Sequence, residues 1–155
     1  MLTIRRAEES DMLTYFHWAN DSGVRANALN KEAIIIENHE KWFMSRINSP
    51  EHHLLYVLEQ NFKPIAQVRF DLEEANLLID YSVDKKNRGM GLGTVALEMA
   101  MTEALNSKIS FKSFIAFVKF TNAGSIKVFE KLGFINVKNE SIEGEIYKFF
   151  EKEVQ

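Results

Sequence analysis

The sequence predicts a single α/β domain, in which a mixed sheet, mostly antiparallel at its start, carries helices on both faces. The first observation is the order of the expected elements, because one strand, two helices, three strands, a helix, a strand, a helix and two strands suit a sheet covered by helices. The second is the chain itself, since its 155 residues contain no repeat, no low-complexity tract and no linker rich in glycine, serine or proline. We therefore expect one domain over residues 1–155.

The first third of the chain is expected to form a short strand and two helices. Leu2–Arg6 is interpreted as the strand. Glu8–Asn20 has large apolar residues at near-helical spacing and ends at a turn-prone Asn-Asp-Ser-Gly segment. Glu37–Ile47 is the second helix, in which His39 and Phe43 share one stripe.

Three strands are expected in the middle of the chain. Leu54–Gln60 and Ile65–Leu72 suggest a hairpin that turns through Asn61–Pro64, and Ala75–Val83 follows as the third strand. The later elements are a long amphipathic helix, a strand, a short helix closed by a glycine, and two final strands: Gly91–Asn106, Phe114–Val118, Ser125–Leu132 with Gly133, Phe134–Lys138 and Glu145–Phe150.

Charge and residue types exclude several classes of function. A net charge of −3 without a clustered basic face argues against nucleic-acid binding. The absence of cysteine removes disulfides, thiolate catalysis, zinc fingers and iron–sulfur clusters. Among the four histidines, His52 and His53 are adjacent and no His-Glu-x-x-His spacing occurs, so no metal site is expected.

No segment of the sequence suggests a membrane or secreted protein. No stretch approaches the roughly 18 consecutive apolar residues that cross a bilayer. Residues 1–6 carry charges without a long apolar run behind them, unlike a signal peptide. We expect a cytoplasmic protein without a membrane partner, present as a monomer or a homodimer.

Three of the seven glycines alternate in a short segment between a predicted strand and a predicted helix: Gly89, Gly91 and Gly93. Without side chains, the backbone can approach a ligand closely, and the first N–H groups of the helix have no intrahelical partner. Those donors and the positive end of the helix dipole favour an anion. Arg88 at the rim adds a fork of donors suited to phosphate, so this turn is a candidate phosphate site.

Other glycine-rich phosphate sites fit this turn less well. A P-loop requires a Gly-Lys-Ser/Thr sequence, which is missing. A dinucleotide-binding fingerprint can be aligned with Gly91–Ala96, but it needs an acidic residue about twenty positions later, where Ala116–Lys119 has no carboxylate. An ordinary tight turn is the structural alternative, although three alternating glycines exceed what such a turn needs.

Two separated motifs resemble the GNAT superfamily of acetyl-CoA-dependent N-acetyltransferases. The first is Arg or Gln, two residues, Gly, one residue and Gly or Ala, which Arg88, Gly91 and Gly93 match. The second is Asn122–Phe134, which is similar to that family's asparagine–serine helix ending in Leu-Gly-Phe. The order of elements extends the resemblance over nearly the whole chain.

The resemblance implies a splayed sheet that holds acetyl-CoA without a metal. Its pantetheine arm would lie between the strand ending at Val83 and the strand Phe114–Val118, and would pair with main-chain groups like an added strand. A main-chain N–H near Val83 would polarise the thioester carbonyl. The expected cofactor-binding residues are Tyr81, Ser82, Val83, Arg88, Gly89, Met90, Gly91, Leu92, Gly93, Thr94, Asn122, Ser125 and Phe129.

Acetyl transfer needs a neutral amine and, in many enzymes, an acid for the departing thiolate. Many GNAT enzymes use a tyrosine on the last helix as the acid, but Phe129 stands at that position. Either water or another group such as Tyr147 would then serve. Asp80 is the candidate base, because a carboxylate within an apolar strand is costly to bury without a partner and should face a cleft or a donor. A structural aspartate with a satisfied side chain is the alternative.

Three aromatic residues of the N-terminal half are further candidates for the acceptor side. His39 has an ordinary pKa near 6.5 that suits acid–base chemistry, although a lone histidine on a helix is often structural. Trp18 and Trp42 are expected to pack in the core or, as a second interpretation, to stack on a substrate ring.

The N-terminal half also resembles one GNAT branch, which acetylates the 4-amino group of nucleotide-linked amino sugars in pathways of the pseudaminic-acid type. Two short sequence motifs are shared. The first is Trp-x-Asn-Asp followed by Val-Arg, in residues 17–25, and the second is His-x-x-Trp-Phe, in residues 39–43. The resemblance implies a sugar-nucleotide acceptor, for whose anionic tail Arg25 and Arg69 are candidate partners.

Three alternatives to this acceptor stay open at the level of sequence. A ribosomal-protein-type enzyme that acetylates protein N-termini shares part of the tryptophan-containing pattern. A degenerate member of the family could bind acyl-CoA without catalysis, for which Phe129 is the argument. Finally, the two shared motifs could serve only to pack the first two helices together, with Arg25 paired to Asp21.

Overall fold

A seven-stranded sheet in the order β1-β2-β3-β4-β5-β7-β6 is the frame of the molecule. The computed structural model describes residues 1–155. The helices and strands are β1 (Leu2–Arg6), α1 (Met12–Ala19), α2 (Ser22–Ala26), α3 (Ile36–Ile47), β2 (His53–Gln60), β3 (Lys63–Glu73), β4 (Asn76–Val83), α4 (Leu92–Leu105), β5 (Ser113–Lys119), α5 (Ala123–Lys131), β6 (Ile135–Ile142) and β7 (Glu145–Glu153), with short 3₁₀ turns at Glu9–Asp11 and Lys85–Asn87.

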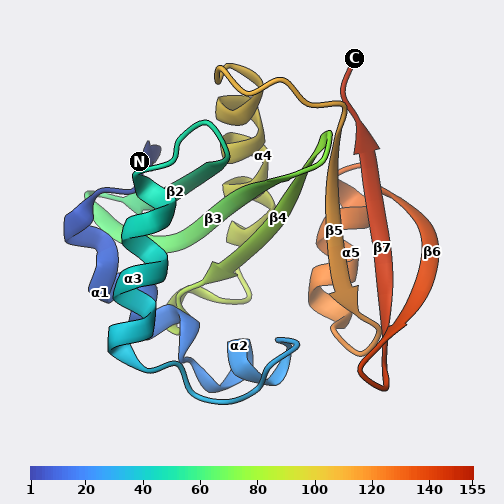
Figure 1. The fold of residues 1–155 in the computed structure, drawn as a ribbon, viewed down its shortest axis with the longest axis horizontal. Coiled ribbons are helices and arrows are strands. Elements are labelled where there is room, and N and C mark those ends of the chain that lie inside the picture. The colour runs from blue at the N-terminus through green and yellow to red at the C-terminus, as the bar shows by residue number, and fades with distance from the viewer.

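All neighbouring strands are antiparallel except β4 and β5, which are parallel. These two strands pair only over Asn76–Leu78 and Ser113–Ile115, and then diverge, as Figure 1 shows. Each remains fully paired on its other side, β4 with β3 and β5 with β7. The sheet is therefore splayed from its middle to one end, which confirms the predicted mixed and open architecture.

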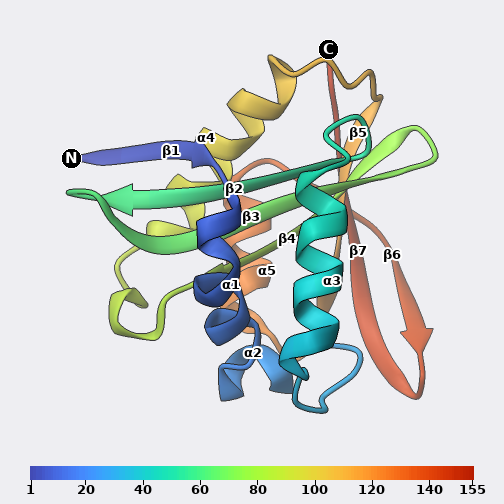
Figure 2. The same ribbon diagram turned by 60° about the vertical axis from the view of Figure 1, so that its left-hand side comes forward.

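Helices cover both faces of the sheet (Figures 1 and 2), and the strand residues alternate accordingly. The α4 and α5 face holds the main core of 21 buried residues, to which β3 contributes Val68 and Phe70. The α1 and α3 face holds a smaller cluster around Phe43, Leu55 and Val57. No helix combines the length and apolar character that a membrane crossing requires.

The α2 segment is a helix that the sequence did not predict. Residues 20–23 were expected to form a turn, but the Asp21 carboxylate accepts the N–H groups of Gly23 and Val24 and caps a five-residue helix. Such a helix is too short for its apolar periodicity to be recognised, so the cap was the only signal in the sequence.

The β2–β3 hairpin is tighter than expected. Its turn is Asn61-Phe62 alone, and both residues have positive φ angles, of 50° and 69°. Pro64 was assigned to the turn, but it lies within β3 opposite Glu59, where a shift in register tolerates a residue without an N–H. The strands β6 and β7 also extend further than predicted, to Ile142 and Glu153, because pairing with each other continues them.

Candidate active site

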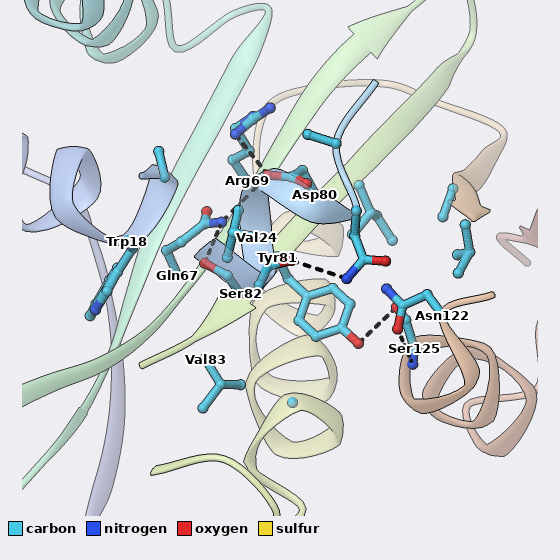
Figure 3. A pocket seen from close by; sticks show the side chains of 18 of the residues that line it. Trp18, Val24, Gln67, Arg69, Asp80, Tyr81, Ser82, Val83, Asn122 and Ser125 are labelled. Carbon is cyan, nitrogen blue, oxygen red and sulfur yellow. Dashed lines mark hydrogen bonds and ion pairs between the residues drawn. The ribbon is translucent and has the colours of Figure 1, made fainter. Parts of the chain in front are cut away.

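One large cleft opens where β4 and β5 diverge, with a volume of about 1010 Å³. Its walls come from β3, β4, β5 and β7 and from all five helices, and Figure 3 shows part of this lining. Cavities of roughly 300–1,000 Å³ typically hold one small ligand. The cleft therefore has room for a long ligand, or for two ligands that meet. The structure has no cluster of three or more histidine, cysteine, aspartate or glutamate side chains placed to hold a metal ion.

The glycine turn lies at the open end of β4 and begins α4. Gly89 and Gly91 have φ angles of 79° and 74°, in the left-handed region, and a Cβ at either position would meet no atom within 4 Å. Gly91 is also the N-cap of α4, and no side chain caps this helix. The first N–H groups of α4 are thus left for a ligand, as an anion site requires.

Gly93 is needed for a different reason. A Cβ there would lie 3.1 Å from Cε2 of the Tyr81 ring. Glycine at this position lets Tyr81 pack directly against the start of α4. Two of the three glycines thus serve the backbone path of the turn, and the third serves side-chain packing.

Arg88, the candidate phosphate partner at the rim of the turn, joins the turn to α2. Its Nη2 donates to Asp21 Oδ2 at 2.9 Å, and its Nε donates to the Val83 carbonyl at 2.9 Å. Burial alone would raise the pKa of Asp21, but the hydrogen bonds from Arg88 and from the Val24 N–H hold it below its usual value. Asp21 therefore pairs with Arg88, and the predicted alternative of a pair with Arg25 is wrong.

A second contact joins the same two regions. Trp18 Nε1 donates to Asp84 Oδ1 at 3.0 Å, so α1 is attached to the segment that follows β4. Trp18 is buried in the smaller core and also lines the cleft. The N-terminal helices and the glycine turn are thereby held in one arrangement.

The edge of β4 that faces the cleft has no strand paired to it beyond Leu78. From Ile79 to Val83, its main chain is paired on the β3 side only. The outward main-chain groups can accept an extended ligand as an added strand. The residues assigned to cofactor binding for their main chain, Tyr81, Ser82 and Val83, all lie on this edge.

The Tyr81 side chain contributes a hydroxyl that the sequence reasoning missed. Its Oη lies 2.9 Å from Ser125 Oγ, so it connects β4 to the first turn of α5 (Figure 3). Burial raises the pKa of Tyr81, whereas the Ser125 contact lowers it, and burial prevails. The Asn122 side chain accepts the Ser125 N–H at 3.3 Å and caps α5, which holds Ser125 in place.

Phe129 is a residue of the main core. It is 2% exposed, and its ring packs against Tyr81, Phe134 and Phe150 with centroid separations of 5.9, 5.0 and 5.7 Å. Its ring also reaches the cleft wall, next to Tyr81. The phenol that lies beside α5 thus comes from β4 and not from the helix.

Asp80 projects from β4 into the cleft with half of its side chain exposed. Its Oδ2 forms an ion pair with Arg69 Nη1 at 2.7 Å and accepts a hydrogen bond from Gln67 Nε2 at 3.4 Å, and no hydrogen bond reaches Oδ1. The Arg69 guanidinium lies over the Trp42 ring, 4.9 Å from its centroid. From the sequence, this carboxylate was expected to face a cleft or a hydrogen-bond donor. In the structure Asp80 faces the cleft and also contacts Arg69 and Gln67.

His39 and Arg25 are occupied by contacts within the fold. The His39 ring is 3% exposed, its Nε2 lies 3.0 Å from the Met12 carbonyl, and burial lowers its pKa. Arg25 donates through Nε to the Ala19 carbonyl at 2.7 Å and through Nη1 to the Asn30 carbonyl at 2.9 Å. Both residues line the cleft, but their main contacts organise its wall.

Tyr147 lies across the cleft from β4. It is 4% exposed, is paired with Lys119 of β5 in the sheet register, and lines the cleft. Its hydroxyl makes no hydrogen bond of good geometry. Burial, and then the nearby Glu145 carboxylate, raise the pKa of Tyr147. Tyr147 therefore stays the candidate proton donor that the sequence suggested.

Residues 1–135 match the sequence profile of a family described as acetyltransferase (GNAT) domain. No curated protein matches the chain by sequence. The fold is similar to that of YncA from Salmonella typhimurium, a proposed acetyltransferase solved with acetyl-CoA, with a TM-score of 0.82, 20% identity and coverage of 99% of this chain and 94% of that one.

Two further solved structures share the fold. RimL, a ribosomal L7/L12 α-N-protein acetyltransferase solved with coenzyme A, has a TM-score of 0.82 and 17% identity over 99% of this chain and 94% of that one. AAC(6′)-Ib, an aminoglycoside acetyltransferase solved with ribostamycin and coenzyme A, has a TM-score of 0.82 and 17% identity over 98% and 93%.

Replacing Gly91 with valine is expected to abolish acetyl-CoA binding while the protein stays folded. A side chain there strains the left-handed backbone and stands in front of the α4 N-terminus. Gly144→Val is the matched control, because Gly144 also has a positive φ, of 81°, with open space around it, but lies in the β6–β7 turn. Each change should cost about 1–3 kcal/mol of stability. Calorimetry that found equal acetyl-CoA affinity in both variants would remove the turn from the phosphate site.

Proposed function

The chain belongs to the GNAT acetyltransferase family, and we propose that it transfers the acetyl group of acetyl-CoA to the 4-amino group of a nucleotide-linked amino sugar. The observation that carries the proposal is the large cleft between β4 and β5, which has an uncapped helix N-terminus at one end and the Asp80 carboxylate, paired with Arg69, inside. Bound acetyl-CoA supplies an acetyl group activated as a thioester.

Three features of the cleft fit acetyl-CoA. The uncapped α4 N-terminus offers N–H donors for the pyrophosphate, with Gly91 leaving the approach open. The free edge of Ile79–Val83 offers main-chain groups for the pantetheine amides. Arg88 lies at the same turn and would reach phosphate by exchanging its contact with Asp21.

Asp80 is the residue proposed to receive the acceptor amine. Its Oδ2 is held by two donors, so Oδ1 is the oxygen presented to a ligand. A carboxylate fixed in this way can orient an amine and take up the proton that the amine loses on attack. Arg69 contributes by holding Asp80, in place of the direct contact with an anionic tail that the sequence suggested.

Tyr81 is the residue proposed to hold the proton for the departing thiol. Its Oη lies on the wall of the cleft, paired with Ser125, between the β4 edge and α5. Like an ordinary tyrosine, Tyr81 is protonated at neutral pH, and burial raises its pKa further. Tyr147 is the competing donor, with a buried and unpartnered hydroxyl on the opposite wall.

The two motifs shared with the amino-sugar branch, in residues 17–25 and 39–43, lie at the wall of the cleft where we place the acceptor. Asn20 exchanges hydrogen bonds with the main chain of Ile34 at 2.7 and 3.0 Å, and Asp21 caps α2. Arg25 fixes the following loop. These residues therefore determine the shape of the acceptor side of the cleft. Their similarity to the amino-sugar branch supports a similar acceptor.

Asp80→Asn is expected to lower kcat/KM for the acceptor by roughly 10²–10⁴-fold, since it keeps the size of the side chain but loses its basicity. Acetyl-CoA affinity should stay unchanged. Glu74→Gln is the control, because it removes one charge from the exposed turn of the same hairpin. Near-normal activity together with a lower melting temperature for Asp80→Asn would instead assign Asp80 a structural role.

Tyr81→Phe is expected to lower kcat by about 10²-fold, the lower end of what general acids contribute, with little change in acetyl-CoA affinity. The competing variant is Tyr147→Phe, for which a smaller loss of kcat is expected. Steady-state kinetics of both variants at saturating acetyl-CoA decide between them. A larger loss for Tyr147→Phe would transfer the role of acid to Tyr147.

The acceptor is tested by incubating the protein with acetyl-CoA and UDP-linked 4-amino-6-deoxy sugars. We expect a product that is heavier by one acetyl group in the mass spectrum, and release of free coenzyme A detected with a thiol reagent. Acetylation of a peptide N-terminus without turnover of any sugar would favour the protein acceptor. Binding of acetyl-CoA without transfer to any amine would support a non-catalytic protein.

A further inference from the structure

Buried polar atoms without a partner gather at the cleft. Four buried side-chain atoms in the molecule lack a hydrogen bond, and three of them belong to residues that line the cleft: Gln67 Oε1, Arg69 Nε and Tyr147 Oη. The fourth is Arg46 Nε, on α3. The two arginine atoms have the Asp71 carboxylate nearby, 3.8 Å from Arg69 Nε and 3.5 Å from Arg46 Nε, whereas Gln67 Oε1 and Tyr147 Oη are the atoms that a ligand could pair.

Among these three residues, Gln67 gives the clearest evidence of an unpaired atom, because its amide orientation is fixed. Nε2 faces Asp80 Oδ2 at 3.4 Å and Ser82 Oγ at 3.2 Å (Figure 3). A carboxylate only accepts hydrogen bonds, so the amide nitrogen and not the oxygen must face Asp80. Both hydrogens of Nε2 are thereby engaged, and Oε1 is left as an acceptor without a donor.

The neighbours of Gln67 account for its NH₂ group but not for its carbonyl oxygen. Gln67 is 5% exposed, and the adjacent Ala66 and Val68 point to the opposite face of the sheet, into the main core. Across the sheet Gln67 is paired with Val57 of β2, in the smaller apolar cluster, and with Ser82 of β4, which accepts from its NH₂ group. The carbonyl oxygen is left unpaired, which costs stability.

We propose that Gln67 binds the acceptor while it positions Asp80. Its NH₂ group holds the carboxylate, and its Oε1 accepts a hydrogen bond from a hydroxyl or N–H of the acceptor. This inference rests on the proposed acetyl transfer. Because Oε1 and Nε2 share one carbon and Nε2 contacts Asp80, a donor that reaches Oε1 approaches the part of the cleft where Asp80 receives the amine. The acceptor class that fits both contacts is an amine with a nearby hydroxyl or N–H, such as a vicinal amino alcohol.

The test combines one variant with two ligands, measured by calorimetry in the presence of coenzyme A. The ligands are a UDP-linked 4-amino-6-deoxy sugar and the same sugar without the hydroxyl next to its amine. Gln67→Met keeps the length of the side chain and removes both polar atoms. Because the change also releases Asp80, both sugars should bind more weakly, but the Kd of the parent sugar should rise about 3- to 10-fold more than that of the deoxy sugar, the value of one neutral hydrogen bond.

Two controls keep the result interpretable. Gln60→Met makes the same change at the exposed end of β2 and should alter neither Kd. On the wild-type protein alone, the deoxy sugar should bind about 3- to 10-fold more weakly than the parent, which needs no variant to fold. Equal losses for both sugars in Gln67→Met, or equal affinities on the wild type, would overturn the proposed contact.

A second pair of ligands distinguishes a wrong acceptor class from a wrong role for Gln67. If no UDP sugar binds the wild-type protein, the nucleotide-sugar acceptor is wrong, and the same experiment uses peptides that begin with serine or alanine. Serine carries a hydroxyl on the carbon next to its α-carbon, whereas alanine does not. A preference for the serine peptide that disappears in Gln67→Met supports the role of Gln67, and a preference that is absent or survives the substitution overturns it.

Discussion

The short pairing of β4 with β5 is the constraint on which the rest of the site depends. The two strands share only three pairs of residues before they diverge, although each is fully paired on its other side. Unpaired backbone groups are tolerated where a ligand or water can satisfy them, so the free edge of β4 favours an extended polar ligand. The glycine turn follows the open end of β4, and the start of α5 follows the open end of β5. Both are therefore brought to the mouth of one cleft.

Two side-chain contacts couple this mouth to the acceptor side. Arg88 bonds to Asp21 and Trp18 to Asp84, so α1 and α2 are attached to the segment where the cofactor's phosphates would lie. On the sheet face that α1 and α3 cover, a polar group forms where β3 and β4 adjoin, from Gln67, Arg69 and Asp80. Three of their atoms make no hydrogen bond, Asp80 Oδ1, Gln67 Oε1 and Arg69 Nε, and we assign the two oxygens to the acceptor.

Local patterns in the sequence were sufficient for the order of elements and the glycine turn, because periodicity and glycine placement act over a few residues. They were insufficient for contacts between distant segments. Arg88 and Asp21 are 67 positions apart, and Tyr81 and Ser125 are 44 apart, so neither pair could be assigned without the fold. Gln67 could have been selected by the reasoning that selected Asp80, since both are polar residues within apolar strands. The sequence did not show that they meet across β3 and β4.

The central claim is that acetyl-CoA lies along the free edge of β4, with its phosphates at the start of α4. Amide hydrogen exchange, with and without acetyl-CoA, tests this most directly because it reports on individual N–H groups. We expect added protection at Leu92–Thr94 and at those amides of Ile79–Val83 that are not bonded to β3, with β1 and β2 unchanged. Protection elsewhere, with both of these segments unaffected by bound acetyl-CoA, would contradict the account.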